Sequence, residues 1–190
     1  MKTNQILTFI LAVFIIISCN KNSDTGNTTT PIDVSAQWKF DLLGYPILAL
    51  ADGQWQSKTF TSNELNLFNS LDTANLSGTT TPASVVETPG SYNSIYPNPF
   101  NSVFAMYFRF TTGYSGPFVF KCVIVDSLMN PIVKKVVRLQ ATVSPVPGNP
   151  SSSNFQIMPN IPIGRFRLYY TLNSQANPHF YKSWGNIQSQ

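Results

Sequence analysis

Residues 102–110 read SVFAMYFRF, and residues 118–125 read FVFKCVIV. In the first stretch, large apolar side chains recur at every second position from Phe104 to Phe110. Successive side chains of a β-strand point to opposite faces, so this alternation predicts a strand with one buried face. The second stretch has the same apolar character and predicts a second strand.

Three more stretches predict strands: residues 132–139, 163–172 and 180–187. Segments rich in Gly, Pro, Asn and Ser separate the strands and predict loops, among them SPVPGNPSSSN at residues 144–154. Short strands at this spacing are typical of an antiparallel β-sandwich, so the predicted fold class is all-β. In the strand at 163–172, alternation places Phe166, Leu168, Tyr170 and Leu172 inward and Arg165, Arg167, Tyr169 and Thr171 outward.

Residues 34–91 are predicted to form a small β-rich extension with one short helix. The Ala-Asp-Gly turn at residues 51–53 suggests a hairpin between the stretches on either side of it. Thr61 and Glu64 match a capping box, which predicts a short amphipathic helix near residues 62–71. The sequence leaves open whether this extension completes the sandwich or forms a separate domain.

The N-terminus is typical of a bacterial signal peptide over residues 1–18, with a positive start at Lys2 and an apolar run too short to span a bilayer. The sequence Ile-Ile-Ser-Cys at residues 16–19 resembles a lipobox. This resemblance implies cleavage before Cys19 and lipidation of its thiol. The mature chain would then be anchored to a membrane by acyl chains such as palmitate, without spanning it.

Behind the lipidated cysteine, residues 19–33 are predicted to form a flexible tether, because residues 20–31 contain no large apolar side chain. We therefore expect a lipid-anchored protein of the outer membrane of a Gram-negative bacterium. Lipoproteins exported to the cell surface, in the bacterial group that this chain resembles, usually carry several acidic residues after the cysteine. Only Asp24 lies close to Cys19, so the periplasmic and the cell-surface face both stay open.

Residues 96–101 read YPNPFN. This hexapeptide resembles the opening of a group of Ig-like domains, which includes the C-terminal sorting domains of the type IX secretion system and the Ig-like domain of flagellar hook-capping proteins. Residues 123–133 and 164–170 resemble, in register, a strand–turn–strand unit and a late strand of that family. The resemblance covers residues 92–190 and implies an Ig-like β-sandwich for this half of the chain.

The two prolines of YPNPFN fix their own φ angles and push the preceding residues into an extended conformation, so Phe100 is expected to be an anchor at the mouth of the sandwich. Two features depart from the family. Its turn usually contains a glycine where residues 128–131 read LMNP, and this chain ends in the polar, uncharged stretch SWGNIQSQ. A C-terminal secretion signal would also be redundant with an N-terminal lipid.

Charge is divided along the chain. Residues 97–190 carry eight lysines and arginines against one aspartate, whereas residues 20–96 carry three lysines against seven carboxylates. Basic strand faces can contact an acidic partner or anionic lipopolysaccharide, or they can simply be solvated. Nucleic acid is not expected as a partner of an exported chain. The candidate contact residues are Lys134, Arg138, Arg165 and Arg167.

No cluster of side chains in the sequence points to a reaction. His179 follows a proline in a polar stretch and has no cluster of other metal ligands near it in the sequence. Cys122 falls on the same face of its strand as apolar aromatic residues, which is typical of a buried cysteine. Cys122 also has no disulfide partner once Cys19 is lipidated. We therefore expect a chain that is not an enzyme and that needs no metal ion and no cofactor.

Trp38 and Trp55 leave two interpretations open. Both can belong to the core, or both can face outward on one hairpin and stack against sugar rings. Three functions are compatible with the sequence: an Ig-like interaction or scaffolding module of the cell envelope, a glycan-binding surface lipoprotein, and cargo of the type IX system. The first is the one we expect, with another envelope protein as partner.

Overall fold

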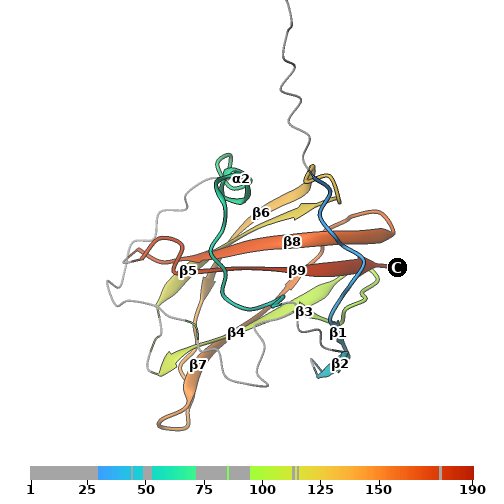
Figure 1. The fold of residues 1–190 in the computed structure, drawn as a ribbon. Helices are drawn as coiled ribbons and strands as arrows, with labels where there is room; N and C mark the ends of the chain where they lie inside the picture. The colour runs from blue at the N-terminus through green and yellow to red at the C-terminus, as the bar shows by residue number, and fades with distance from the viewer. Residues whose placement is uncertain are drawn as a thin grey trace, which may run out of the picture. The chain divides into compact units, whose positions relative to one another are not determined.

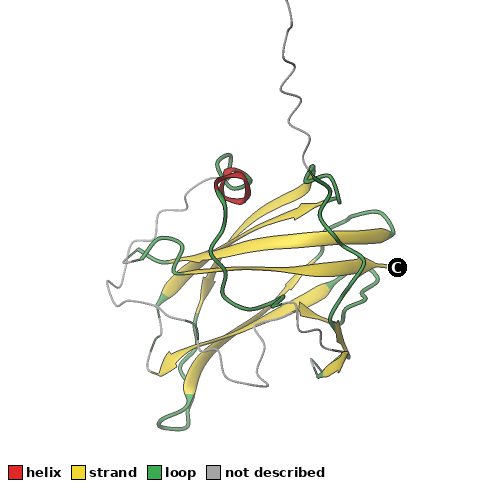
Figure 2. Cartoon of the chain, in the orientation of Figure 1, coloured by secondary structure: helices red, strands yellow, loops and turns green. Residues whose placement is uncertain are grey.

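The computed structural model describes residues 30–43, 45–48, 53–71, 85, 95–112, 114, 116–175 and 177–190. Over these residues the chain is an all-β sandwich of antiparallel sheets with one short helix (Figure 1, Figure 2), which confirms the predicted fold class. The predicted signal peptide and Cys19 lie outside the described residues.

Two sheets form the layers of the sandwich, and every strand pair within them is antiparallel. The smaller sheet has the order β3 (Ile95–Tyr96), β4 (Phe104–Thr112), β7 (Pro150–Ile157). The larger sheet has the order β6 (Pro131–Gln140), β5 (Pro117–Val125), β8 (Gly164–Asn173), β9 (Tyr181–Ser189). Strands β4, β5, β6, β8 and β9 fall within two residues of the predicted strands.

Four aromatic rings from four strands meet at the centre of the core. The ring of Phe108 in β4 lies 6.1 Å from that of Phe120 in β5 and 5.9 Å from that of Phe155 in β7, measured between centroids. The ring of Tyr170 in β8 lies 5.7 Å from Phe108 and 5.8 Å from Phe120. Two of these strands belong to each sheet, so the ring contacts join the layers; each such pair contributes about 0.5–1.5 kcal/mol beyond its buried area.

The loop predicted at residues 144–154 is a strand over its second half, and that part of the prediction was wrong. β7 pairs with β4, with Phe110 opposite Ser151 and Phe108 opposite Ser153. Both serines are buried. Small side chains on one strand leave space for phenyl rings on the other, so a stretch that is turn-like in isolation becomes part of the core layer. Strand preference depends on such neighbours more than on the residue itself.

The outer face of the larger sheet carries a second buried cluster. The ring of Phe60 lies 5.6 Å from that of Tyr169 and 6.1 Å from that of Phe68. Two valines of β5 belong to the same cluster. Tyr169 was predicted to face solvent and lies away from the main core, yet it is 1% exposed because this segment covers it. Thr171, predicted in the same way, is also buried.

The short helix α2 (Ser62–Asn66) is the one that the capping box predicts, although it ends five residues earlier than expected. The hydroxyl of Thr61 accepts a hydrogen bond from the backbone N–H of Glu64 at 3.3 Å, and the Glu64 carboxylate accepts one from the Thr61 N–H at 2.8 Å. The turns after the helix carry Phe68 into the second cluster. The capping box therefore specifies where the helix begins. After Asn66 the helix gives way to turns with i→i+3 hydrogen bonds, such as that from the N–H of Leu71 to the carbonyl of Phe68 at 2.9 Å.

Ala51 and Asp52, in the turn of the predicted hairpin, lie outside the described residues, and the described residues on either side of that turn form no strand pair with each other. Instead, β1 (Lys39–Phe40) pairs with β2 (Pro46–Leu48). Asp41 shapes the turn between them, because its carboxylate accepts a hydrogen bond from the backbone N–H of Tyr45 at 2.8 Å. The hairpin thus lies earlier in the sequence than the glycine turn indicated.

The stretch after Gly53 lies along the edge of β9. The N–H of Trp55 donates to the carbonyl of Trp184 at 2.8 Å, and the N–H of Lys58 donates to the carbonyl of Lys182 at 2.8 Å. These long-range bonds satisfy backbone groups that an edge strand would otherwise leave open. A local turn signal cannot reveal a partner that lies more than 120 residues away.

The YPNPFN segment leads from β3 toward β4 and runs beside the end of β9. Phe100 bridges Ser189 in parallel, and its N–H donates to the carbonyl of Gln188 at 3.0 Å. Its side chain is 1% exposed and packs edge-on to Phe104, with 5.0 Å between ring centroids. Phe100 is therefore the buried anchor that the sequence predicts.

Asn98, in the middle of YPNPFN, joins three parts of the chain. Its Nδ2 donates to the carbonyls of Trp38 at 2.7 Å and Asn186 at 3.0 Å, and its Oδ1 accepts from the N–H of Gln188 at 3.1 Å. Its backbone exchanges two hydrogen bonds with that of Phe40, at 3.0 and 3.2 Å. Asn98 is completely buried and cannot reach water, so these bonds satisfy its polar groups.

We expect Asn98→Ala to lower the free energy of unfolding by about 3 kcal/mol, because it leaves two carbonyls and one N–H buried without their partner. Urea unfolding followed by circular dichroism measures the change. The matched control is Asn154→Ala, which removes one exposed hydrogen bond to the Tyr96 hydroxyl and should cost less than about 1 kcal/mol. Equal losses in the two variants would contradict the role given to Asn98.

Candidate functional site

Both candidate tryptophans lie in the core rather than on a surface. Trp38 is 3% exposed and Trp55 is 1% exposed. The Trp55 ring lies 6.4 Å from the Tyr170 ring and packs directly over Gly185, where an added Cβ would clash with the indole. Neither ring has a free face, so in this structure they offer no platform for a sugar.

Arg167 takes part in a network that holds the fold. Its Nε donates to Oδ1 of Asn186 at 2.9 Å, its Nη2 donates to the carbonyl of Asp33 at 2.6 Å, and its guanidinium lies 3.9 Å from the centre of the Trp184 ring. The amide of Asn186 also donates to the carbonyl of Ala36 at 2.7 Å. The network fastens the segment before β1 onto β8 and β9, which is a structural task for Arg167.

The other three basic candidates lie on the same sheet and remain exposed. Lys134 of β6 donates to the hydroxyl of Ser70 at 2.6 Å and so touches the segment that follows α2. Arg138 lies further along β6, and Arg165 lies near the start of β8. The structure therefore places all four predicted residues on one sheet but divides them between structural and surface positions.

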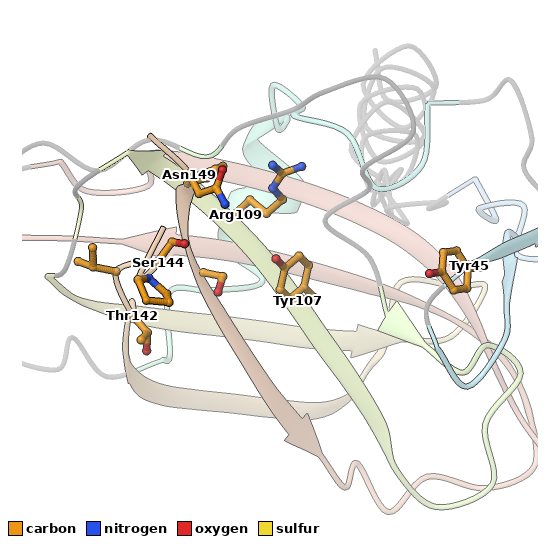
Figure 3. Close-up of a pocket in the computed structure, with 10 residues that line it drawn as sticks. Tyr45, Tyr107, Arg109, Thr142, Ser144 and Asn149 are labelled. Carbon is orange, nitrogen blue, oxygen red and sulfur yellow. The ribbon is translucent and has the colours of Figure 1, made fainter. Parts of the chain in front are cut away.

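A cleft of about 740 Å³ opens on the outer face of the smaller sheet (Figure 3). Tyr107 and Arg109 of β4 and Ser152 of β7 contribute to its lining. Alternation along β4 points the side chains of Tyr107 and Arg109 away from the core, and both are half-buried. Tyr45, from the β1–β2 turn, lines the cleft as well, and in Figure 3 Tyr107 lies between Arg109 and Tyr45.

The loop between β6 and β7 completes the lining of the cleft. Thr142 bridges Ser152 through two backbone hydrogen bonds of 2.8 and 2.9 Å, which hold the start of this loop against β7. Thr142, Ser144 and Asn149 contribute polar groups, and none of the described residues that line the cleft is acidic. The site combines aromatic rings, hydroxyl and amide groups, and one guanidinium.

Sequence reasoning missed this cleft because its residues come from three distant segments. The alternation along β4 did place Tyr107 and Arg109 on the face opposite the core, and that was the available signal. An aromatic and a cationic side chain two residues apart on a solvent face are worth noting. The sequence predicted the loop at residues 144–154, but it gave no indication that this loop packs beside Tyr107 and Arg109.

The β1–β2 hairpin presents an unusual number of apolar side chains to solvent. Leu42 and Leu43 are each 77% exposed, and Ile47 is 69% exposed. Tyr45 and Leu48 are also exposed. Single apolar side chains on a surface are ordinary, but a group of them on one projecting element is typical of an interaction site.

The reactive side chains of the described residues do not form a catalytic arrangement. Cys122 is completely buried, and burial raises the pKa of its thiol to about 12. His179 lies in a surface turn, where partial burial and the charges of Lys121 and Lys182 hold its pKa below the usual value. Across the residues that the structure describes, no three histidine, cysteine or carboxylate side chains converge as metal ligands. Within the same residues, no helix has the length and apolar character needed to cross a bilayer.

Comparisons with known proteins add little. No family model matches the chain, and no curated protein sequence matches it. Among solved structures, a glycosyl hydrolase family 2 member from Bacteroides cellulosilyticus aligns with 56% of this chain, at 7% identity and a TM-score of 0.34. The aligned part is 14% of that hydrolase, and the likeness is too low to support an argument.

We expect the Cys122 thiol to stay unlabelled by a thiol reagent in the folded protein and to react fully in urea, because it is buried and kept neutral. The measurement uses the Cys19→Ser chain, which has Cys122 as its one remaining cysteine. Since the folded pKa is raised from 9.0 to about 12, the unfolded state loses this proton first. Stability should therefore fall as the pH rises above about 9, and less so in Cys122→Ala. Rapid labelling at pH 8 in native buffer would contradict this picture.

Proposed function

We propose that this chain is a non-enzymatic lipoprotein, anchored to the outer membrane of a Gram-negative bacterium through Cys19, whose β-sandwich binds another protein of the cell envelope. The observation that carries the proposal is the exposed apolar hairpin at residues 42–48, which projects from an otherwise well-packed body. A membrane anchor keeps such a body close to envelope partners at high local concentration.

The anchor is supported by the sequence before the sandwich. Residues 16–19 have the aliphatic and small residues of a lipobox before its cysteine, and residues 20–31 are polar. The compact unit begins at Pro31, so a short polar stretch separates it from Cys19. Two or more acyl chains are enough for stable attachment, since each buried methylene contributes about 0.8 kcal/mol.

The hairpin is suited to a protein partner because its shape is fixed before binding. Phe40, at its base, is 2% exposed and is paired with Asn98. Asp41 closes the turn through hydrogen bonds to the N–H groups of Leu43 and Tyr45, at 2.9 and 2.8 Å. A preformed element loses little conformational entropy on association, and each apolar side chain that a partner buries contributes about 1.5–3 kcal/mol.

The basic side chains of the larger sheet support a second, electrostatic contribution. Arg138 and Arg165 are exposed, and the C-terminal half that contains them has a large excess of positive charge. Exposed charges of one sign mainly raise the rate at which an acidic partner associates, and salt screens them. The hairpin would then supply affinity and the arginines would guide the encounter.

For the anchor, we expect Cys19→Ser to move the protein from the membrane fraction to the soluble fraction. Mass spectrometry of the wild-type protein should show loss of residues 1–18, added acyl chains, and a C-terminus that still ends at Gln190. Loss of the C-terminal half would instead identify type IX cargo. A wild-type protein without acyl chains would contradict the proposal.

For the hairpin, we compare the amount of partner protein that co-purifies from crosslinked membranes. We expect this amount to be at least tenfold lower for the double variant Leu43→Ser/Ile47→Ser than for the wild-type protein. The two side chains are 77% and 69% exposed, so the fold should tolerate the change. The matched control is Ile163→Ser, which removes an apolar side chain that is 83% exposed outside the hairpin. If all three proteins capture the same partners in equal amounts, the hairpin is not the binding surface.

A further inference from the structure

We infer that the cleft on the smaller sheet binds an acidic oligosaccharide, that is, a sugar chain with carboxylate groups, with Arg109 receiving a carboxylate and Tyr107 stacking against a sugar ring. This inference concerns the outer face of the smaller sheet, and the cleft shares Tyr45 with the exposed hairpin at residues 42–48. It does not depend on whether a protein partner binds the other exposed side chains of that hairpin. Its basis is the shape, the lining and the charge of the cleft.

The dimensions of the cleft fit a ligand of this kind. Its volume of about 740 Å³ lies within the range of about 300–1,000 Å³ that is usual for ligand sites. The lining runs from the β6–β7 loop, across β4, to Tyr45 at the hairpin (Figure 3). An elongated site on an open sheet face suits a chain of several sugar units better than a single compact metabolite.

The lining chemistry matches a sugar. The Tyr107 ring, fixed on β4, can pack against the C–H face of a pyranose, and Tyr45 can do the same at the far end. Beyond the Tyr107 ring, on the side away from Tyr45, Ser144 and Asn149 offer hydroxyl and amide groups (Figure 3), and Ser152 adds another hydroxyl to the lining. These groups both donate and accept hydrogen bonds, as sugar hydroxyls require.

Charge selects an acidic sugar over a neutral one. Arg109 is the single charged side chain among the described residues that line the cleft. Its planar guanidinium can hold a carboxylate through two parallel hydrogen bonds, an arrangement stronger than a neutral hydrogen bond. The described lining contains no carboxylate, and the basic C-terminal half adds a favourable long-range field.

An extended peptide fits this place less well. A peptide that adds to a sheet needs an open strand edge. At Ser152, β7 is paired with Arg109 of β4 on one side and with Thr142 on the other. The edge is therefore already occupied beside the cleft, and a ligand there must use side chains rather than backbone pairing.

The test is calorimetric titration of the full chain, purified in detergent, with oligogalacturonate and with a neutral galacto-oligosaccharide of equal length. We expect binding of the acidic oligosaccharide only. Arg109→Ala and Tyr107→Leu should each weaken it at least tenfold, and Arg109→Lys should weaken it less than Arg109→Ala, because lysine keeps the charge but loses the planar fork. Thermal melts of each variant establish that it is folded.

The matched control is Arg165→Ala, which removes an exposed arginine from the other sheet and should weaken binding far less than Arg109→Ala, because it changes only the long-range field. Absence of binding at millimolar oligogalacturonate would overturn the inference. So would equal binding of the neutral oligosaccharide, or an equal loss in Arg109→Ala and Arg165→Ala, since the latter would mean that general positive charge and not the cleft attracts the ligand.

Discussion

The buried amide of Asn98 is the contact on which the arrangement of this chain depends. It holds the carbonyls of Trp38 and Asn186 and the N–H of Gln188, while its backbone pairs with Phe40. One side chain thus joins the N-terminal arm, the YPNPFN segment and the last strand. A buried polar group of this kind is stable only when all its bonds are made, so the three segments must assemble together.

Both surfaces that carry our proposals follow from that contact. The β1–β2 hairpin extends from Phe40, and its position relative to the sandwich is set where Phe40 pairs with Asn98. The hairpin carries the exposed apolar side chains, and it also carries Tyr45, which lines the cleft. A binding element built on a fixed base loses little entropy on association, which is why a hairpin this small can serve as a recognition surface.

On the larger sheet, one of the few charged side chains of this chain stabilises the fold. Arg167 binds Asn186 and the carbonyl of Asp33 and lies over the ring of Trp184, so it fastens the N-terminal segment to two strands. Phe60 and Phe68 then cover Tyr169 on the same face. The face expected to be solvated and basic is therefore partly a second apolar layer, and the polar cleft lies on the smaller sheet instead.

The sequence by itself determined the strands with clear alternation, the start of α2 and the burial of Phe100, because side-chain period, capping and aromatic size act over a few residues. It also singled out Cys19, whose lipidation remains a prediction. Only the tertiary structure decided that serines opposite Phe108 and Phe110 make a core strand, that residues 55–58 pair with β9, and that Trp38 and Trp55 are buried. The cleft belongs to the second group, since Tyr45, Arg109 and Asn149 are brought together by pairings between distant segments. Such pairings depend on which partner offers an edge or a space, and no local pattern in the sequence records that.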